Sequence, residues 1–166
     1  MHSSRYNGAV APAAREFEIR DSTPEDFELL WRLDQECFPP GIAYSKNELG
    51  TYMRHRGAFT LVAADIISKS IVGFVVAYGG RTGHVITIDV APKARRSGVG
   101  SILLRAAEER LAAAGICAVG LETAVDNLGA LSFYKRHGYG VIRTWPRYYS
   151  NGVDALVLEK KLNGIS

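Results

Sequence analysis

A glycine-containing turn directly before a strongly patterned helix constrains the fold more than any other part of the sequence. Residues 90–115 read VAPKARRSGVGSILLRAAEERLAAAG, with Gly98 and Gly100 in the turn and Gly115 at the far end. The apolar residues after the turn recur at spacings of three and four, which predicts a helix over residues 98–114 that stops at Gly115. The expected buried face of this helix comprises Val99, Ile102, Leu103, Ala106 and Ala107.

The start of this predicted helix has the chemistry of an anion site. Glycines leave main-chain N–H groups uncovered at the positive end of the helix dipole. Arg95 and Arg96 add positive charge that does not titrate. A pyrophosphate would satisfy more of these donors than a single sulfate-sized anion. The alternative is an ordinary helix start beside solvated arginines.

Two familiar phosphate-binding motifs are absent from the turn. It lacks the Gly-Lys-Ser/Thr ending of nucleotide P-loops. It also lacks the third glycine of the dinucleotide fingerprint, and no acidic residue follows at the usual distance on a strand end. The turn therefore indicates a different kind of phosphate ligand.

Strand and helix patterns alternate along the rest of the chain. Alternating or continuous apolar runs predict strands over residues 16–20, 59–65, 70–79, 83–90, 117–123, 139–145 and 154–161. Further helices are expected over residues 23–38, from residue 45 and over residues 127–138. This order predicts a mixed α/β layer structure of about seven strands and four helices. We expect a single domain over residues 15–163, preceded by a loose tail over residues 1–14.

Composition and charge exclude several classes of protein. A net charge of +3 on 166 residues is too small to predict binding to nucleic acid. No apolar run is long enough to span a bilayer, and the first 15 residues lack the apolar core of a signal peptide. Cys37 and Cys117 have neither paired nor metal-ligand spacing, which favours a reducing compartment. We expect a cytoplasmic protein without a metal or a membrane partner, acting as a monomer or homodimer.

The segment VAPKARRSGVGSILL resembles motif A of the Gcn5-related N-acetyltransferases (GNAT), written (Gln/Arg)-x-x-Gly-x-(Gly/Ala), with Arg95, Gly98 and Gly100 in the diagnostic places. In that family the turn holds the pyrophosphate of acetyl-coenzyme A. The resemblance implies the acyl-CoA N-acyltransferase fold and a cofactor held by the main chain of Arg96, Ser97, Gly98, Val99, Gly100 and Ser101. It also implies that the pantetheine arm of the cofactor lies as an added strand along Ile88, Asp89 and Val90.

A second segment, LETAVDNLGALSFYKRHGYGVI, is similar to a later motif of the family. Glu122, Asn127 and Tyr134 stand at the spacing of the subgroup that acetylates protein N-termini, which includes ribosomal-protein alanine and archaeal N-terminal acetyltransferases. The segments RTGHVITIDV and YYSNGVDALVL resemble the same subgroup. The resemblance implies direct transfer of the acetyl group of acetyl-CoA to a primary amine in a ternary complex, with a protein or peptide N-terminus as the acceptor.

Acetyl transfer to an amine requires a base, and two residues compete for that role. Glu122 lies in an otherwise apolar strand, where a carboxylate is costly unless it is paired or used. The alternative for Glu122 is an outward-facing residue paired with a cation. His84 has an ordinary pKa near neutrality and should share a strand face with Ile86, Ile88 and Val90. Because an α-amino group has a pKa of about 8, relay through water would also suffice.

The other two demands are a stabilised oxyanion and a protonated leaving thiolate. The resemblance assigns the oxyanion to the N–H of Val90, freed by a strand bulge there. A phenol is a neutral donor at neutral pH, which suits Tyr134 to protonate the thiolate; the alternative is a buried aromatic on the helix. Asn127 is expected to bond the cofactor arm or to cap the following helix. Neither Cys37 nor Cys117 has the setting of an acetyl-carrying thiolate, and Cys117 is expected in the core.

Two loops are expected to form the acceptor site. In CFPPGIAYS, Phe38, Pro39 and Tyr44 would line an apolar pocket for the first residue of the acceptor. In PRYYSNG, Tyr148 and Tyr149 would hydrogen-bond the peptide main chain. The alternative for each residue is packing of the loop against the core.

Two positions depart from the subgroup. Ala124 stands where the subgroup usually has arginine, and Val153 stands where it often has an acid. An acetyltransferase for a small amine, such as a polyamine, an amino acid or an antibiotic, therefore remains an alternative. A non-catalytic acyl-CoA-binding module is a third.

Overall fold

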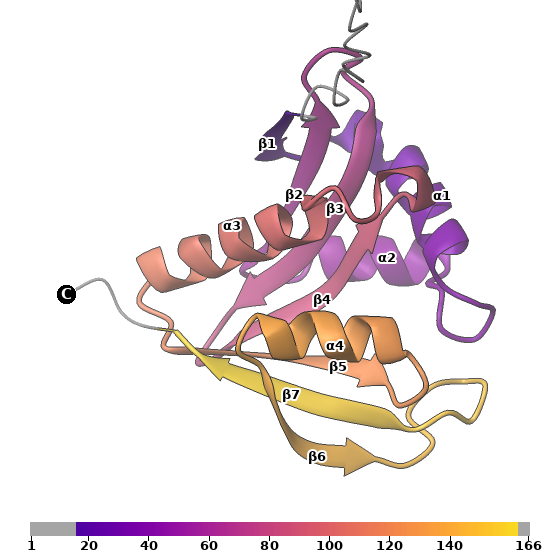
Figure 1. The fold of residues 1–166 in the computed structure, drawn as a ribbon, viewed down its shortest axis with the longest axis vertical. Coiled ribbons are helices and arrows are strands. Elements are labelled where there is room, and N and C mark those ends of the chain that lie inside the picture. The colour runs from indigo at the N-terminus through magenta and orange to yellow at the C-terminus, as the bar shows by residue number, and fades with distance from the viewer. Residues whose placement is uncertain (1–15, 163–166) are drawn as a thin grey trace, which may run out of the picture.

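A computed structural model of the chain describes residues 16–162, which fold around one seven-stranded sheet (Figure 1). The strands lie in the order β1-β2-β3-β4-β5-β7-β6, and every neighbouring pair is antiparallel except β4 and β5. Their bounds are β1 Phe17–Asp21, β2 Ala58–Asp65, β3 Ile71–Gly79, β4 Gly83–Val90, β5 Ala118–Ala124, β6 Gly140–Trp145 and β7 Ala155–Lys161. The predicted mixed sheet is confirmed. The tail expected over residues 1–14 lies outside the described residues.

Four α-helices cover the two faces of this sheet, as predicted. They are α1 Phe27–Cys37, α2 Lys46–Met53, α3 Val99–Ala113 and α4 Leu128–Arg136, and short 3-10 turns at Pro24–Asp26 and Pro92–Ala94 precede α1 and α3. Helices α1 and α2 lie on one face, and α3 and α4 lie on the other (Figure 1). No helix within residues 16–162 is long and apolar enough to cross a membrane.

Local sequence signals set the ends of these helices. Ser45 Oγ accepts the N–H of Glu48 at 3.1 Å, which satisfies one of the free donors at the start of α2. Gly98 and Gly115 flank α3 with φ angles of +86° and +84°, in the left-handed region that favours glycine. The turn that opens α3 therefore depends on main-chain geometry that only its glycine adopts without strain.

The buried face of α3 differs from the predicted one. Ile102 is 39% exposed, whereas Leu104 and Leu111 are buried. The buried residues are Val99, Leu103, Leu104, Ala107, Glu108 and Leu111. Val99, Leu103 and Ala107 are common to both sets, whereas Leu104, Glu108 and Leu111 are buried in place of Ile102 and Ala106. The helix is therefore rotated slightly about its axis relative to the prediction. Spacings of three and four fit either face, and packing against β3 and β4 decides between them.

Strands β4 and β5 pair over two positions only and then separate. The parallel register joins Gly83 to Val119 and His84 to Gly120, and it ends there. Beyond these pairs, one edge of β4 has no strand partner within residues 16–162. The separation divides the sheet into a β1–β4 part and a β5–β7 part, and the site described below lies between them.

A bulge in β4 changes which side chains share a face. Thr87 pairs with Val76 and Val85 pairs with Ala77, so Ile86 is the extra residue. His84 contacts Tyr78, whose ring also contacts His55 just after the end of α2, so both lie on the face that α1 and α2 cover. Val90 lies within reach of Gly100 at the start of α3, on the opposite face. The expectation that His84 shares a face with Ile88 and Val90 is therefore wrong, because the bulge shifts the alternation by one residue.

A buried ionic cluster joins the two parts of the sheet. Glu108 on α3 is 7% exposed. Its carboxylate accepts the phenolic O–H of Tyr139 at 3.0 Å and the ammonium of Lys160 on β7 at 3.0 Å. Because α3 packs mainly on β3 and β4, these bonds attach the C-terminal strands to the rest of the molecule.

We expect Glu108→Ala to lower the free energy of unfolding by about 2–3 kcal/mol, because it leaves Tyr139 and Lys160 without their acceptor. Glu109→Ala, at the exposed next position of the same helix, should change it by about 0.5 kcal/mol or less. Urea titration of both variants measures the difference. Equal stability of the two variants would show that the cluster does not join the parts of the sheet.

Candidate active site

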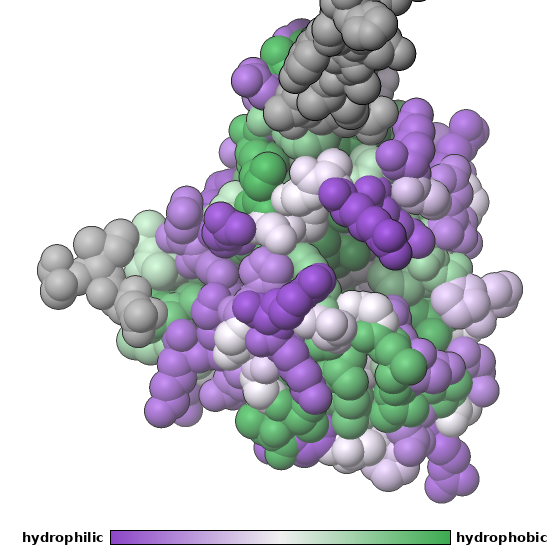
Figure 2. Space-filling view, in the orientation of Figure 1, coloured by the Kyte–Doolittle hydropathy of each residue, from purple (hydrophilic) through white to green (hydrophobic). Residues whose placement is uncertain are grey.

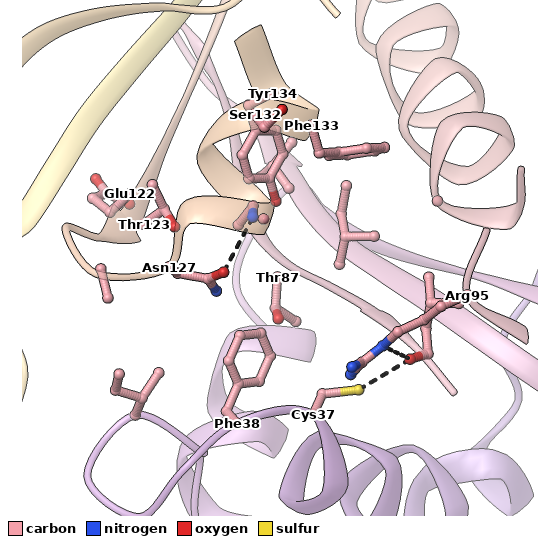
Figure 3. Close-up of a pocket in the computed structure, with 18 of the residues that line it drawn as sticks. Cys37, Phe38, Thr87, Arg95, Glu122, Thr123, Asn127, Ser132, Phe133 and Tyr134 are labelled. Atoms are coloured by element: carbon pink, nitrogen blue, oxygen red, sulfur yellow. Dashed lines mark hydrogen bonds between the residues drawn. The ribbon is translucent and has the colours of Figure 1, made fainter. Parts of the chain in front are cut away.

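A cavity of about 1250 Å³ occupies the space where β4 and β5 separate (Figure 3). Its walls come from the end of α1 and the following loop, from β4 and the turn before α3, from β5 and α4, and from the β6–β7 loop. Figure 2 shows a recess between the positions of α3 and α4, with hydrophilic side chains on either side of it. The cavity is therefore open on the α3–α4 side of the sheet, and its lining extends to residues of the α1 end and the following loop on the other side.

The glycine turn forms one wall of this cavity. Gly98, Val99, Gly100 and Ser101 line it together with Arg95 and Arg96. A Cβ atom at Gly98 would meet nothing within 4 Å, so the main chain is open to a ligand there. The first N–H groups of α3 have no partner within the helix and point out of its start. These residues fit a phosphate group. Ser97 does not line the cavity, and its hydroxyl donates to the carbonyl of Ala94.

The free edge of β4 forms a second wall. Because Ala91 N–H donates to the Val72 carbonyl at 2.8 Å, strand alternation turns the main chain of Ile88 and Val90 away from β3. The Val90 carbonyl accepts the Cys37 thiol at 3.4 Å and Arg95 Nε at 3.3 Å (Figure 3). The N–H groups of Ile88 and Val90 face the gap, where an extended ligand would pair with them.

Two expectations about β4 are wrong. Asp89 was grouped with Ile88 and Val90, but its main chain faces β3 and its side chain is fully buried. The bulge expected at Val90 lies at Ile86 instead. The N–H of Val90 is free for a simpler reason: β5 has already separated from β4 at that level.

Helix α4 supplies the third wall. Asn127 Oδ1 caps the helix by accepting the N–H of Ala130 at 3.1 Å, and Figure 3 shows its amide nitrogen turned into the cavity. Asn127 therefore caps α4 with its oxygen and still has its amide nitrogen available to a ligand, so the two alternatives for this residue are compatible. Tyr134 is 8% exposed and lines the cavity. Burial, then the nearby Asp89 carboxyl group, raises the pKa of the Tyr134 phenol above its ordinary value, so the phenol remains a proton donor.

Helix α4 also brings residues to the cavity that the sequence analysis did not assign. Phe133 lies 3.4 Å from the Cβ position of Gly100, and Arg136 and His137 follow it along the cavity wall. With Ala130 they follow the three- and four-residue spacing of one helix face. That spacing in the sequence predicts that they share the face on which Tyr134 and Ala130 border the cavity. Thr123 and Cys37 line the cavity as well, and no sequence pattern marks them.

The two candidate bases form one unit. His84 Nε2 lies 2.6 Å from Glu122 Oε2, and their side chains are 23% and 16% exposed. His84 Nδ1 is buried without a hydrogen-bond partner among the described residues. A neutral imidazole that donates from Nε2 leaves only an acceptor unpaired at Nδ1, whereas an imidazolium would bury an unpaired N–H there. The geometry therefore favours neutral His84 donating to the Glu122 carboxylate.

A second cavity, of about 590 Å³, adjoins the first on the α1–α2 side. Phe38, Tyr44, Tyr148 and Tyr149 line both cavities and so form their shared wall. Pro39 lines only the first. The two predicted loops are joined where Ser150 Oγ donates to the Gly41 carbonyl at 2.8 Å.

Tyrosine hydroxyls dominate the polar chemistry of the shared wall. Burial raises the pKa of Tyr44 and Tyr149 above the ordinary value, so both keep their protons. The rings of Tyr148 and Tyr149 pack edge to face with centroids 5.0 Å apart. Glu48 is the only carboxylate that lines the second cavity among the described residues.

These features define an acetyltransferase. Residues 21–139 match the Acetyltransferase (GNAT) family, and the chain belongs to that family. An uncharacterised N-acetyltransferase of Methanocaldococcus jannaschii is 28% identical over 86% of this chain and 90% of its own length. An N-alpha-acetyltransferase of Sulfurisphaera tokodaii is 25% identical over 93% of this chain and 98% of its own length. The crystal structure of Ard1 from Thermoplasma volcanium aligns with a TM-score of 0.80 at 27% identity, over 89% of this chain and 98% of that one.

Neither cysteine has the properties of an acetyl carrier. Burial, then the charge of Asp89, raises the pKa of Cys37 to about 11, which keeps its thiol protonated at neutral pH. Cys117 is exposed, so its expected place in the core is wrong. It lies in the turn between α3 and β5, before the buried part of the strand begins.

We expect iodoacetamide to alkylate Cys117 at least about tenfold faster than Cys37 at about pH 8, because alkylation needs an accessible thiolate. The rate at Cys37 should go on rising toward a pH of about 11, the pKa that burial gives its thiol. Mass spectrometry of the digested protein measures both rates, and Cys117→Ser confirms the assignment. Equal rates near pH 8 would contradict the burial of Cys37.

Proposed function

We propose that this acetyltransferase acetylates the α-amino group of protein or peptide N-termini, with acetyl-CoA as the donor. The observation that carries the proposal is the hydrogen-bonded pair of Glu122 and His84 beside a tyrosine-walled cavity. A cavity with one carboxylate in its wall suits a peptide main chain better than a polycation. The naming of the Sulfurisphaera tokodaii relative as an N-alpha-acetyltransferase supports the same class of acceptor.

The residues around the first cavity fit acetyl-CoA. The main chain from Arg96 to Ser101 would hold the pyrophosphate at the start of α3. The N–H groups of Ile88 and Val90 that face the gap, with the Asn127 amide, would bond the pantetheine arm as an added strand. The cofactor would supply an acetyl group activated as a thioester.

Glu122 is the proposed base. Its carboxylate lines the first cavity, and the bond from His84 Nε2 fixes its orientation. An α-amino group has a pKa of about 8, so its ammonium form loses a proton more easily than a lysine side chain does, and a positioned carboxylate can accept that proton directly or through one water.

Tyr134 is the proposed acid. It lies on α4, across the cavity from the free edge of β4 (Figure 3). Because burial keeps its phenol protonated, it can donate a proton from the hydroxyl oxygen when a thiolate forms. The free N–H of Val90 provides a main-chain donor for negative charge that develops on oxygen.

We expect Gly98→Ala to weaken binding of coenzyme A about tenfold, because a methyl group and a strained φ would disturb the phosphate wall. Gly115→Ala is a matched control: it has the same left-handed φ and equally open surroundings at the other end of α3. Both variants should lose about 1 kcal/mol of stability from the strained residue. Calorimetry with coenzyme A measures the affinity, and equal affinities in the two variants would contradict the site.

The function itself is tested by thiol release from acetyl-CoA with short peptides of varied first residue, alongside polyamines and free amino acids. We expect release with peptides that have a free N-terminus and none with the same peptides blocked. Glu122→Gln should lower kcat about 100-fold with little change in the affinity for coenzyme A. Glu109→Gln, on the exposed face of α3, serves as the control.

Two results would overturn the proposal. Release with polyamines but not with peptides would assign the enzyme to small amines. Binding of coenzyme A without release to any amine would make the chain a non-catalytic acyl-CoA-binding module.

A further inference from the structure

Two aspartates meet in the interior beside the first cavity. Asp34 lies on α1 and Asp89 lies on β4, and both are completely buried. Helix α1 packs on β4, and the two carboxyl groups are close enough to interact directly. A carboxylate is seldom buried to this extent unless it is paired with a cation or neutralised, so this contact requires an explanation.

The hydrogen bonds of the pair leave one oxygen on each side without a donor. Asp34 Oδ2 accepts the N–H of Tyr44 at 2.7 Å, and Asp89 Oδ1 accepts the hydroxyl of Thr87 at 2.5 Å. Asp34 Oδ1 and Asp89 Oδ2 are buried and accept no hydrogen bond from any group within residues 16–162. Two ionised carboxylates offer only acceptors to each other, whereas one proton between them makes a bond that satisfies both oxygens.

The groups around the pair favour retention of this proton. Burial comes first among the causes that raise the pKa of Asp34 and Asp89, and the mutual repulsion of two carboxylates adds to it for Asp89. Glu48 on α2 opposes ionisation further, and Arg95 in the turn before α3 favours it. The Cys37 thiol and the Tyr134 phenol also face Asp89, and both are neutral at neutral pH.

The pair connects the two walls between which an acceptor amine would lie. Through the N–H of Tyr44, Asp34 holds the far end of the loop that carries Phe38. Asp89 lies between Ile88 and Val90, the residues of the free β4 edge. Thr87 fixes the carboxyl group of Asp89 from the same strand.

We propose that Asp34 and Asp89 share one proton and act as positioning residues, holding the acceptor loop of residues 38–45 against the free edge of β4. The inference rests on the proposed acceptor role of that loop. At alkaline pH the proton is lost, two like charges face each other in a buried site, and the loop moves away from the strand. The KM for the acceptor then rises, while the affinity for coenzyme A does not change.

Asp89→Asn keeps a hydrogen bond to Asp34 but removes the carboxyl group that can lose the shared proton. The amide nitrogen of asparagine donates to Asp34 at every pH, and its oxygen still accepts from Thr87. We expect the ratio of the wild-type acceptor KM to that of Asp89→Asn to rise at least about threefold between about pH 7 and pH 9.5. The titration of the acceptor amine cancels in this ratio. Asp89→Ala, which removes the bond, should raise the acceptor KM about tenfold at every pH with the coenzyme A affinity within about twofold.

Two further variants complete the test. Asp34→Asn keeps the hydrogen bond to Tyr44 and donates one to Asp89, so it should have the same effect as Asp89→Asn. If Asp89→Asn does not fold, Asp34→Asn takes its place in the test. Glu108→Gln changes another buried carboxyl group, on α3, and should leave the acceptor KM unchanged. A constant KM ratio over this pH range, or an unchanged KM in Asp89→Ala, would overturn the proposal.

A measurement without substrate separates this inference from the proposed function. A carboxyl group with a raised pKa in the folded state holds a proton that the unfolded chain has lost above a pH of about 4. Wild-type stability should therefore fall as pH rises from about 4 through the raised pKa, and Asp89→Asn should not show that fall. The Tm of Asp89→Asn minus the Tm of the wild type should therefore increase between about pH 5 and pH 8. A constant Tm difference would overturn the shared proton even if the enzyme acetylates peptides.

Discussion

The separation of β4 from β5 leaves one strand edge unpaired in the middle of a sheet, and the site depends on that edge. Only two residue pairs join the strands, and beyond them Ile88 and Val90 present main-chain groups to a cavity. Buried main-chain groups require partners, and an extended ligand that pairs like a strand supplies them. The turn at Gly98 lies at the end of the same wall, so one cavity offers both a strand edge and a phosphate site.

The bulge at Ile86 distributes the chemistry between the two faces of the sheet. In a regular strand His84 and Val90 would share a face, because their positions differ by an even number. The bulge instead turns His84 toward α2 and leaves Val90 facing α3. The walls proposed for the cofactor therefore belong mainly to α3 and α4, and the proposed base lies on the side where the two loops of the second cavity meet. A single extra residue in one strand brings the two sides together at the gap.

Burial affects the protonation of several residues around the gap between β4 and β5. Burial keeps the Tyr134 phenol and the Cys37 thiol protonated, and it opposes ionisation of both members of the Asp34–Asp89 pair. Glu122, by contrast, is hydrogen-bonded to the side chain of His84. Glu122, the group proposed to accept a proton, and Tyr134, the group proposed to donate one, therefore lie in different surroundings.

The sequence by itself determined what depends on local spacing. It specified the order of strands and helices, the cap at Ser45, the left-handed glycine before α3, and the family through the motifs around Gly98 and Glu122, because each is encoded within a few residues. Tertiary structure alone decided the face of α3, the bulge at Ile86, the partner of Asp89 and the contact of His84 with Glu122. These features join residues far apart in the chain, and periodicity along one strand or helix carries no information about what packs against it.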